Sequence, residues 1–117
     1  MASRRFIALL FAVVLLSAGR GGAAERFFKG IDDLPVMPGL EQVIGAGVVF
    51  DTPAGRIVEV AAEGAVTRAQ VEQFYAGVLP QLGWRRAEGG WRREGERLRI
   101  GFGTADGVLT VRISLSP

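Results

Sequence analysis

The chain contains no cysteine and no histidine in its 117 residues, and these absences exclude a large part of enzyme chemistry. They leave no Cys–His nucleophilic site, no zinc site of the usual kind and no histidine general base. No disulfide can support the fold either. Lysine occurs once, as Lys29, and the only serines after residue 24 are Ser114 and Ser116, both outside any Gly-x-Ser-x-Gly motif.

Carboxylates are the remaining candidates for catalysis. Asp32 and Asp33 form the only adjacent acidic pair, and neighbouring side chains of an extended chain point to opposite sides. A glycosidase-like site would need Asp32 to converge with a strand acid such as Glu59. The glycines fall at turns, which is not the pattern of a phosphate-binding loop. We therefore predict no catalytic, cofactor or metal site, and a carboxylate-based enzyme is the alternative.

The N-terminus has the pattern of an export signal. Arg4 and Arg5 precede thirteen residues without charge, 6–18, and small residues follow at 21–24. A membrane-spanning helix needs about 20 apolar residues, so this run is typical of a secretory signal cleaved near Ala24. An uncleaved inner-membrane anchor is the alternative, and the paired arginines are also compatible with twin-arginine export. The predicted destination is the bacterial periplasm or the cell exterior.

The predicted leader changes the charge of the remaining chain. The whole sequence has 14 basic and 12 acidic residues, and residues 1–24 hold three of the basic ones and no acid. The 93 residues that follow therefore carry 11 basic and 12 acidic side chains, a net charge of −1. This balance does not favour nucleic acid as a partner. The size is that of one domain with a modest core.

Residues 25–47 have no sustained hydrophobic period. Pro35 and Pro38 favour extended backbone before them, so we expect an extended arm, either packed across the domain or presented to a partner. Its candidate anchors are Phe27, Phe28, Leu34, Met37 and Leu40.

In residues 48–117, apolar and polar residues alternate as in β-strands, both before and after one helical segment. Strands are expected at 48–50 and 56–63, and then at 84–88, 91–94, 97–102 and 108–115. The fold class is therefore α+β, in the order β-β-α-β-β-β-β. We expect an antiparallel sheet of about five to six strands with one amphipathic helix on one face.

The helix is expected to have Thr67 as its N-cap and Gly83 at the C′ position just after its end. Thr67 and Gln70 have the spacing of a capping box, and Gly83 followed by Trp84 favours a Schellman motif. Pro80 should loosen the last turn. The apolar stripe comprises Val71, Phe74, Tyr75, Val78, Leu79 and Leu82, which indicates packing on a sheet.

Arginines cluster after the helix. If Gly89-Gly90 forms a hairpin turn, Arg85 lies opposite Glu94 and Glu94 lies opposite Arg97. Five arginines then share the face away from the helix: Arg85, Arg92, Arg97, Arg99 and Arg112. They could bind an anionic lipid headgroup, a cell-wall phosphate or an acidic partner protein. The simpler explanation is the ordinary polar outer face of a sheet covered on one side. In this register Arg86 and Arg93 point inward, and Trp91 lies at the edge of the core.

Two segments together resemble a family of small exported proteobacterial proteins without an assigned activity. They are DDLPVMPGL at 32–40 and VEQFYAGVLPQLGW at 71–84. The resemblance implies a proline-containing arm, a β-hairpin, a helix ending in Gly-Trp and a meander, and it transfers no functional residue. The layout is also similar to helix-grip domains of envelope assembly accessories, which is an analogy of fold alone.

Export, the lack of catalytic groups and the arginine face together favour a non-enzymatic periplasmic binding or accessory module. Its partner would be an envelope protein, an anionic lipid or a cell-wall component. A self-assembling structural protein, pairing through the arm or an edge strand, is the alternative, and the sequence leaves the oligomeric state open.

Overall fold

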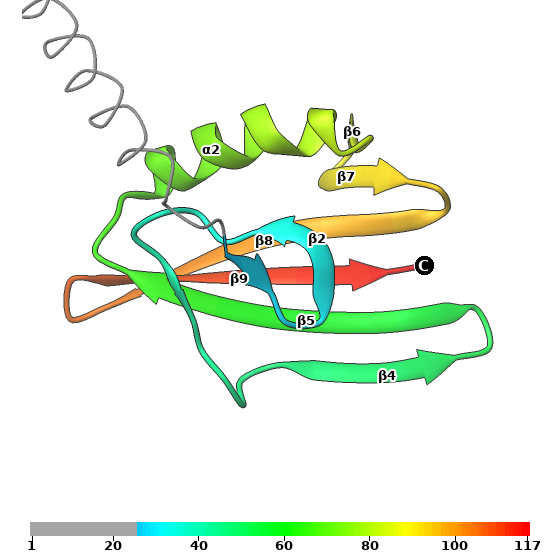
Figure 1. Ribbon diagram of the computed structural model, residues 1–117, viewed down its shortest axis with the longest axis horizontal. Coiled ribbons are helices and arrows are strands. Elements are labelled where there is room, and N and C mark those ends of the chain that lie inside the picture. The colour runs from blue at the N-terminus through cyan, green and yellow to red at the C-terminus, as the bar shows by residue number, and fades with distance from the viewer. Residues whose placement is uncertain (1–25) are drawn as a thin grey trace, which may run out of the picture.

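The protein has an α+β fold, in which one helix packs on an antiparallel sheet (Figure 1). The computed structural model describes residues 26–117, so the predicted leader, residues 1–24, lies outside the described residues. The elements are β1 (Phe27–Phe28), β2 (Ile31–Pro35), β3 (Glu41–Gln42), β4 (Val48–Thr52), β5 (Gly55–Gly64), α2 (Arg68–Gln81), β6 (Arg85–Ala87), β7 (Gly90–Arg93), β8 (Glu96–Ala105) and β9 (Val108–Ser116). The predicted fold class is confirmed.

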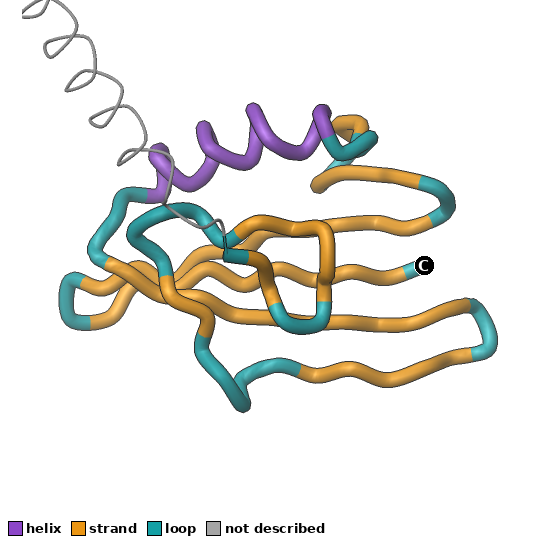
Figure 2. The backbone as a smooth tube through the Cα atoms, viewed as in Figure 1, coloured by secondary structure: helices purple, strands orange, loops and turns teal. Residues whose placement is uncertain are grey.

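The main sheet has seven strands, slightly more than the five to six expected. Its order is β3-β5-β9-β8-β7-β6, and β4 pairs with β5 as well. The long strands β5, β8 and β9 form its centre (Figure 2). Because side chains alternate along a strand, one face of these strands is apolar and buried. We call it the inner face, and its buried residues include Val58, Val60, Leu98, Val111, Ile113 and Leu115.

Both ends of α2 have the predicted local structure. The Gln70 backbone N–H donates to Thr67 Oγ1 at 3.1 Å, and the Thr67 N–H donates to Gln70 Oε1 at 2.9 Å, which confirms the capping box. At the other end the N–H of Trp84 donates to the Leu79 carbonyl at 3.0 Å, and Gly83 has a φ of 91°. This is the Schellman arrangement. The helix runs through Pro80 and ends at Gln81.

The predicted apolar stripe of α2 is only partly buried. Val71, Tyr75 and Leu79 are buried, whereas Phe74 is half-buried and packs edge-on against Tyr75, with 4.9 Å between the ring centroids. The core therefore lies along the Val71–Tyr75–Leu79 line of the helix, and Phe74 flanks it.

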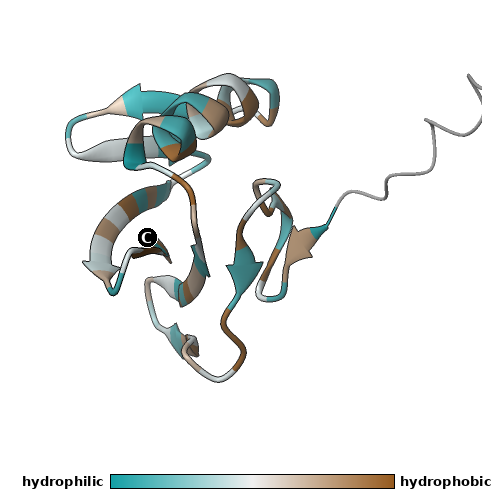
Figure 3. Ribbon diagram, turned by 90° about the vertical axis from the view of Figure 1, so that its left-hand side faces the viewer, coloured by the Kyte–Doolittle hydropathy of each residue, from teal (hydrophilic) through white to brown (hydrophobic). Residues whose placement is uncertain are grey.

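The N-terminal segment has more regular structure than the extended arm that was expected. β1 and β2 form a hairpin, and β3 joins the main sheet by pairing with β5. Figure 3 shows α2 and the β1–β2 hairpin on the same side of the curved sheet. Phe28, Leu34 and Leu40 are buried in the core, whereas Phe27 is 48% exposed. The inner face is thus covered by the helix and by this hairpin together.

Tyr75 links the helix to the segment that follows the hairpin. Its hydroxyl donates to the Pro35 carbonyl at 2.8 Å and accepts from the Met37 N–H at 3.3 Å. Burial raises the pKa of Tyr75 to about 12, although the Met37 N–H acts in the opposite direction. The phenol is therefore held neutral in the folded protein well above the pH at which a free tyrosine ionises.

A pH dependence of stability follows from this raised pKa. The stabilisation is fully present below about pH 10 and is lost as the pH rises toward about 12, by about 2–3 kcal/mol in total. Because Tyr75 is the only tyrosine in the chain, tyrosinate absorbance reports its titration directly. Urea unfolding over the same pH range should show the loss in the native protein and a smaller loss in Tyr75→Phe. An equal loss in Tyr75→Phe would contradict this assignment.

Candidate functional site

The five arginines singled out in the sequence lie on one face of the main sheet. The register pairs Arg85 with Arg92 and Arg92 with Arg97. It also places Arg99 opposite Ser114, and Arg112 opposite Gly101 and Ala61. These residues alternate with the buried ones, so they occupy the face away from α2, which we call the outer face.

The predicted cross-strand partners of these arginines are wrong. Arg85 does not lie opposite Glu94, because the β6–β7 turn is Glu88-Gly89 and Gly90 belongs to β7. A Cβ on Gly90 would overlap the Leu98 carbonyl oxygen, which explains the glycine in the strand. Glu94 lies in the β7–β8 turn with a φ of 48°, outside the strand pairing. Glu94, the acid that was expected to lie among the arginines, is therefore not opposite any of them.

Arg85, Arg92 and Arg97 form a continuous row across β6, β7 and β8, which we call the arginine ladder. Neighbouring strands lie about 4.8 Å apart, and like charges directly opposite each other destabilise a sheet by about 0.2–1 kcal/mol per pair. In residues 26–117, none of the three has a carboxylate oxygen within 4.0 Å. The ladder is thus an uncompensated concentration of positive charge.

The rest of the outer face near the ladder carries glycines and hydrogen-bond donors. Gly101 and Gly103 have nothing within 4 Å of the position that a Cβ would take. Ser114 and Ser116 lie opposite Arg99 and Arg97. Arg112 is different, because its Nη1 lies 3.1 Å from Glu59 Oε1, so its charge is partly compensated.

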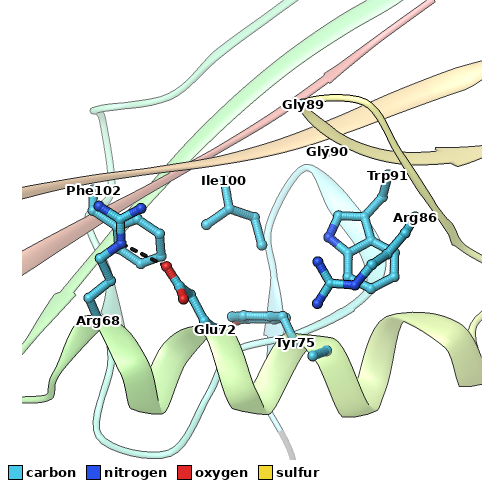
Figure 4. Close-up of a pocket in the computed structure, with 10 residues that line it drawn as sticks. Arg68, Glu72, Tyr75, Arg86, Gly89, Gly90, Trp91, Ile100 and Phe102 are labelled. Carbon is cyan, nitrogen blue, oxygen red and sulfur yellow. Dashed lines mark hydrogen bonds and ion pairs between the residues drawn. The ribbon is translucent and has the colours of Figure 1, made fainter.

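A pocket of about 280 Å³ lies on the other side of the sheet, between α2 and strands β7 and β8 (Figure 4). Its principal lining residues are Arg68, Glu72, Arg86, Trp91, Ile100 and Phe102. The guanidinium carbon of Arg86 lies 4.6 Å from the centroid of the Trp91 ring, and that of Arg68 lies 4.7 Å from the Phe102 ring. Arg68 Nε also donates to Glu72 Oε1 at 2.7 Å.

This pocket was not predicted from the sequence. Arg86 lies on the inner side as expected, and Trp91 is buried at 7% exposure. The Trp91 ring nevertheless serves as a stacking surface for Arg86, which a residue at the edge of the core was not expected to do. The only local signal is Gly89-Gly90, which leaves one wall without side chains.

Arg93, the other arginine expected to point inward, has a structural role. Its Nη1 lies 2.6 Å from Asp33 Oδ2 and donates to the Leu82 carbonyl at 2.9 Å, and its guanidinium stacks 4.3 Å from the Trp84 ring centroid. It thus joins β7, the end of α2 and the hairpin.

Glu59, the strand acid considered as a catalytic partner for Asp32, forms an ion pair with an arginine. Its Oε1 lies 3.1 Å from Arg112 Nη1 on the outer face of the sheet. Asp32 is exposed in β2, and its neighbour Asp33 pairs with Arg93 on the inner side. Glu59 is thus paired with a cation, whereas a glycosidase-like site would need it to converge with Asp32.

Two further observations concern the described part of the chain. Residues 26–117 contain no group of three or more acidic, histidine or cysteine side chains placed to hold a metal ion. Over the same range, no helix has the length and apolar composition needed to cross a bilayer. The chain matches no protein-family model, and comparisons with curated proteins and with solved structures find no significant similarity.

Proposed function

We propose that this protein is a non-enzymatic module of the bacterial envelope whose outer face binds phosphate-bearing anions. The observation that carries the proposal is the arginine ladder, in which Arg85, Arg92 and Arg97 lie directly opposite one another without a carboxylate partner in residues 26–117. A polar outer face could use uncharged or mixed residues without this repulsion. The predicted export signal supports an envelope location.

The shape of the face indicates an extended anionic partner. Arginine binds phosphate through two parallel N–H donors, and the ladder repeats this unit over three neighbouring strands. Farther along β8, the bare glycines Gly101 and Gly103 leave room for a surface or polymer to approach the sheet closely. Phospholipid headgroups and phosphate groups of a cell-wall polymer share this chemistry, so the two sources must be separated by experiment.

Vesicle cosedimentation tests the proposal with the protein produced from the full chain. We expect binding to phosphatidylglycerol vesicles that weakens steeply with salt, and little binding to neutral phosphatidylcholine vesicles, which also control for the leader. Calorimetric titration with inorganic polyphosphate provides the polymer arm. Binding to only one of the two identifies the source, whereas binding to neither, or binding that salt does not weaken, would contradict the proposal.

Self-association is a second candidate, favoured by the exposed apolar edge of β4. Val48, Val49 and Phe50 are 49%, 64% and 49% exposed, and β4 pairs only with β5 (Figure 1). Such an edge can pair with another strand. The opposite edge, β6, is three residues long and carries Arg85 and Arg86. With one edge suited to pairing, association would be two-fold symmetric and would stop at a dimer.

Light scattering at increasing protein concentration tests this second candidate. We expect a monomer–dimer equilibrium that Val49→Lys shifts to monomer, because a charge on the edge strand opposes pairing. Val108→Lys, at another partly exposed valine, is the matched control and should leave the equilibrium unchanged. A protein that stays monomeric at every concentration would argue against the dimer.

A further inference from the structure

The pocket between α2 and strands β7 and β8 has the properties of a small-molecule site, separate from the arginine ladder. The sheet lies between the two, because Arg86 belongs to the inner face and its neighbour Arg85 to the outer face. The pocket and the ladder can therefore bind different ligands, and binding at one can be lost while binding at the other is kept.

The pocket is lined by both polar and apolar side chains, and its apolar part suits a flat body. Figure 4 shows Ile100 between the two arginine–aromatic pairs, with Tyr75 of α2 facing it. Ile100 and Phe102 pack against the core and remain partly exposed. A volume of about 280 Å³ lies just below the usual range for ligand pockets, which run from about 300 to 1,000 Å³. It suits one ring with a short substituent and is too small for a nucleotide.

The rim of the pocket carries one uncompensated positive charge. Arg68 is neutralised by Glu72, 2.7 Å away. Arg86 has no carboxylate oxygen within 4.0 Å in residues 26–117. Its guanidinium is held against the Trp91 ring, so its donors are already oriented before a ligand arrives. Glu72 at the other side of the opening repels a second negative charge and can accept a hydrogen bond.

From this arrangement we infer that the pocket binds a small aromatic monocarboxylate. The carboxylate pairs with Arg86, the ring lies over Ile100 beside Trp91, and a hydroxyl or similar donor on the far side of the ring donates to Glu72. Two parallel N–H donors of an arginine match the two oxygens of a carboxylate. Neutral ligands forgo this pairing, and dianions encounter Glu72.

The probe is 4-hydroxyphenylacetate, titrated into the protein produced from the full chain and followed by the indole N–H resonances of its two tryptophans. We expect a saturable shift of the Trp91 signal, with the Trp84 signal unchanged as a control for folding. The neutral analogue 4-hydroxyphenylacetamide should bind about tenfold more weakly, because it cannot form the charge-assisted pair with Arg86.

Three variants make the result specific. Arg86→Gln should weaken 4-hydroxyphenylacetate binding about tenfold, whereas Arg85→Gln should leave it unchanged. Ala76→Phe should block binding by filling the pocket, because Ala76 lines it from α2. Arg85→Gln should instead weaken vesicle binding, and Arg86→Gln should leave vesicle binding almost unchanged. Failure of the pocket proposal would therefore not imply failure of the ladder proposal, or the reverse. No saturable shift, equal binding of the amide, or equal losses in Arg85→Gln and Arg86→Gln would overturn the inference.

Discussion

Replacing Trp84 by alanine is expected to lower the free energy of unfolding by about 3–5 kcal/mol, as removal of a buried aromatic side chain does. Trp84 is 2% exposed and lies directly after the Schellman turn that ends α2. Arg93 stacks on its ring and reaches Asp33 in the hairpin. Loss of the indole would therefore leave a cavity where the helix, the hairpin and β7 meet, and would also release Arg93.

Phe74→Ala is the matched comparison, since it removes an aromatic ring from the same helix. Phe74 is only half-buried, so we expect a loss of roughly 1–2 kcal/mol, in line with partial burial of its apolar surface. Both values can be measured by urea unfolding followed by circular dichroism. A cost for Phe74→Ala equal to that of Trp84→Ala would contradict the packing described here.

The second large effect concerns the arginine ladder. We expect the triple variant Arg85→Gln, Arg92→Gln and Arg97→Gln to bind phosphatidylglycerol vesicles about 100-fold more weakly. Each arginine near an anionic surface contributes about 1 kcal/mol, and three together correspond to about two orders of magnitude in affinity. Vesicle cosedimentation at low salt measures the change.

The same triple variant is expected to be as stable as the native protein or slightly more stable. Direct opposition of like charges costs about 0.2–1 kcal/mol per pair, and the ladder contains two such pairs. Binding and stability should therefore move in opposite directions. A clear loss of stability in urea unfolding would indicate that the arginines serve the fold and would count against a binding role.

Much of the fold could be predicted because its signals are local. The ends of α2 depend on Thr67 with Gln70 and on Gly83 with Trp84, all within one turn of the helix ends they define. The face of each arginine was also predictable despite the wrong register. Arg85 lies opposite Arg92 where Glu94 was expected, and a shift of two residues keeps every side chain on its own face while it changes its neighbours.

The arrangement of the residues on which the two binding proposals rest could not be predicted, because it depends on distant parts of the chain. The ladder exists because both hairpins differ from expectation: the β6–β7 turn at Glu88-Gly89 places Arg85 opposite Arg92, and the β7–β8 register places Arg92 opposite Arg97. The burial of Tyr75 depends on the β1–β2 hairpin and the segment after it, which supply the carbonyl of Pro35 and the N–H of Met37 to Tyr75. Its neighbour Phe74 remains half-buried. The pocket depends on the separation between α2 and β8, which no periodic pattern encodes.

Binding of anions by the outer face is tested most directly by comparing two triple variants of equal net charge in the same vesicle assay. One removes the ladder arginines, and the other replaces Arg56, Arg68 and Arg86, on the side of the sheet that carries α2, with glutamine. We predict that the ladder variant loses about 100-fold in affinity and that the helix-side variant changes only slightly. Equal losses, or a larger loss in the helix-side variant, would contradict binding by the outer face.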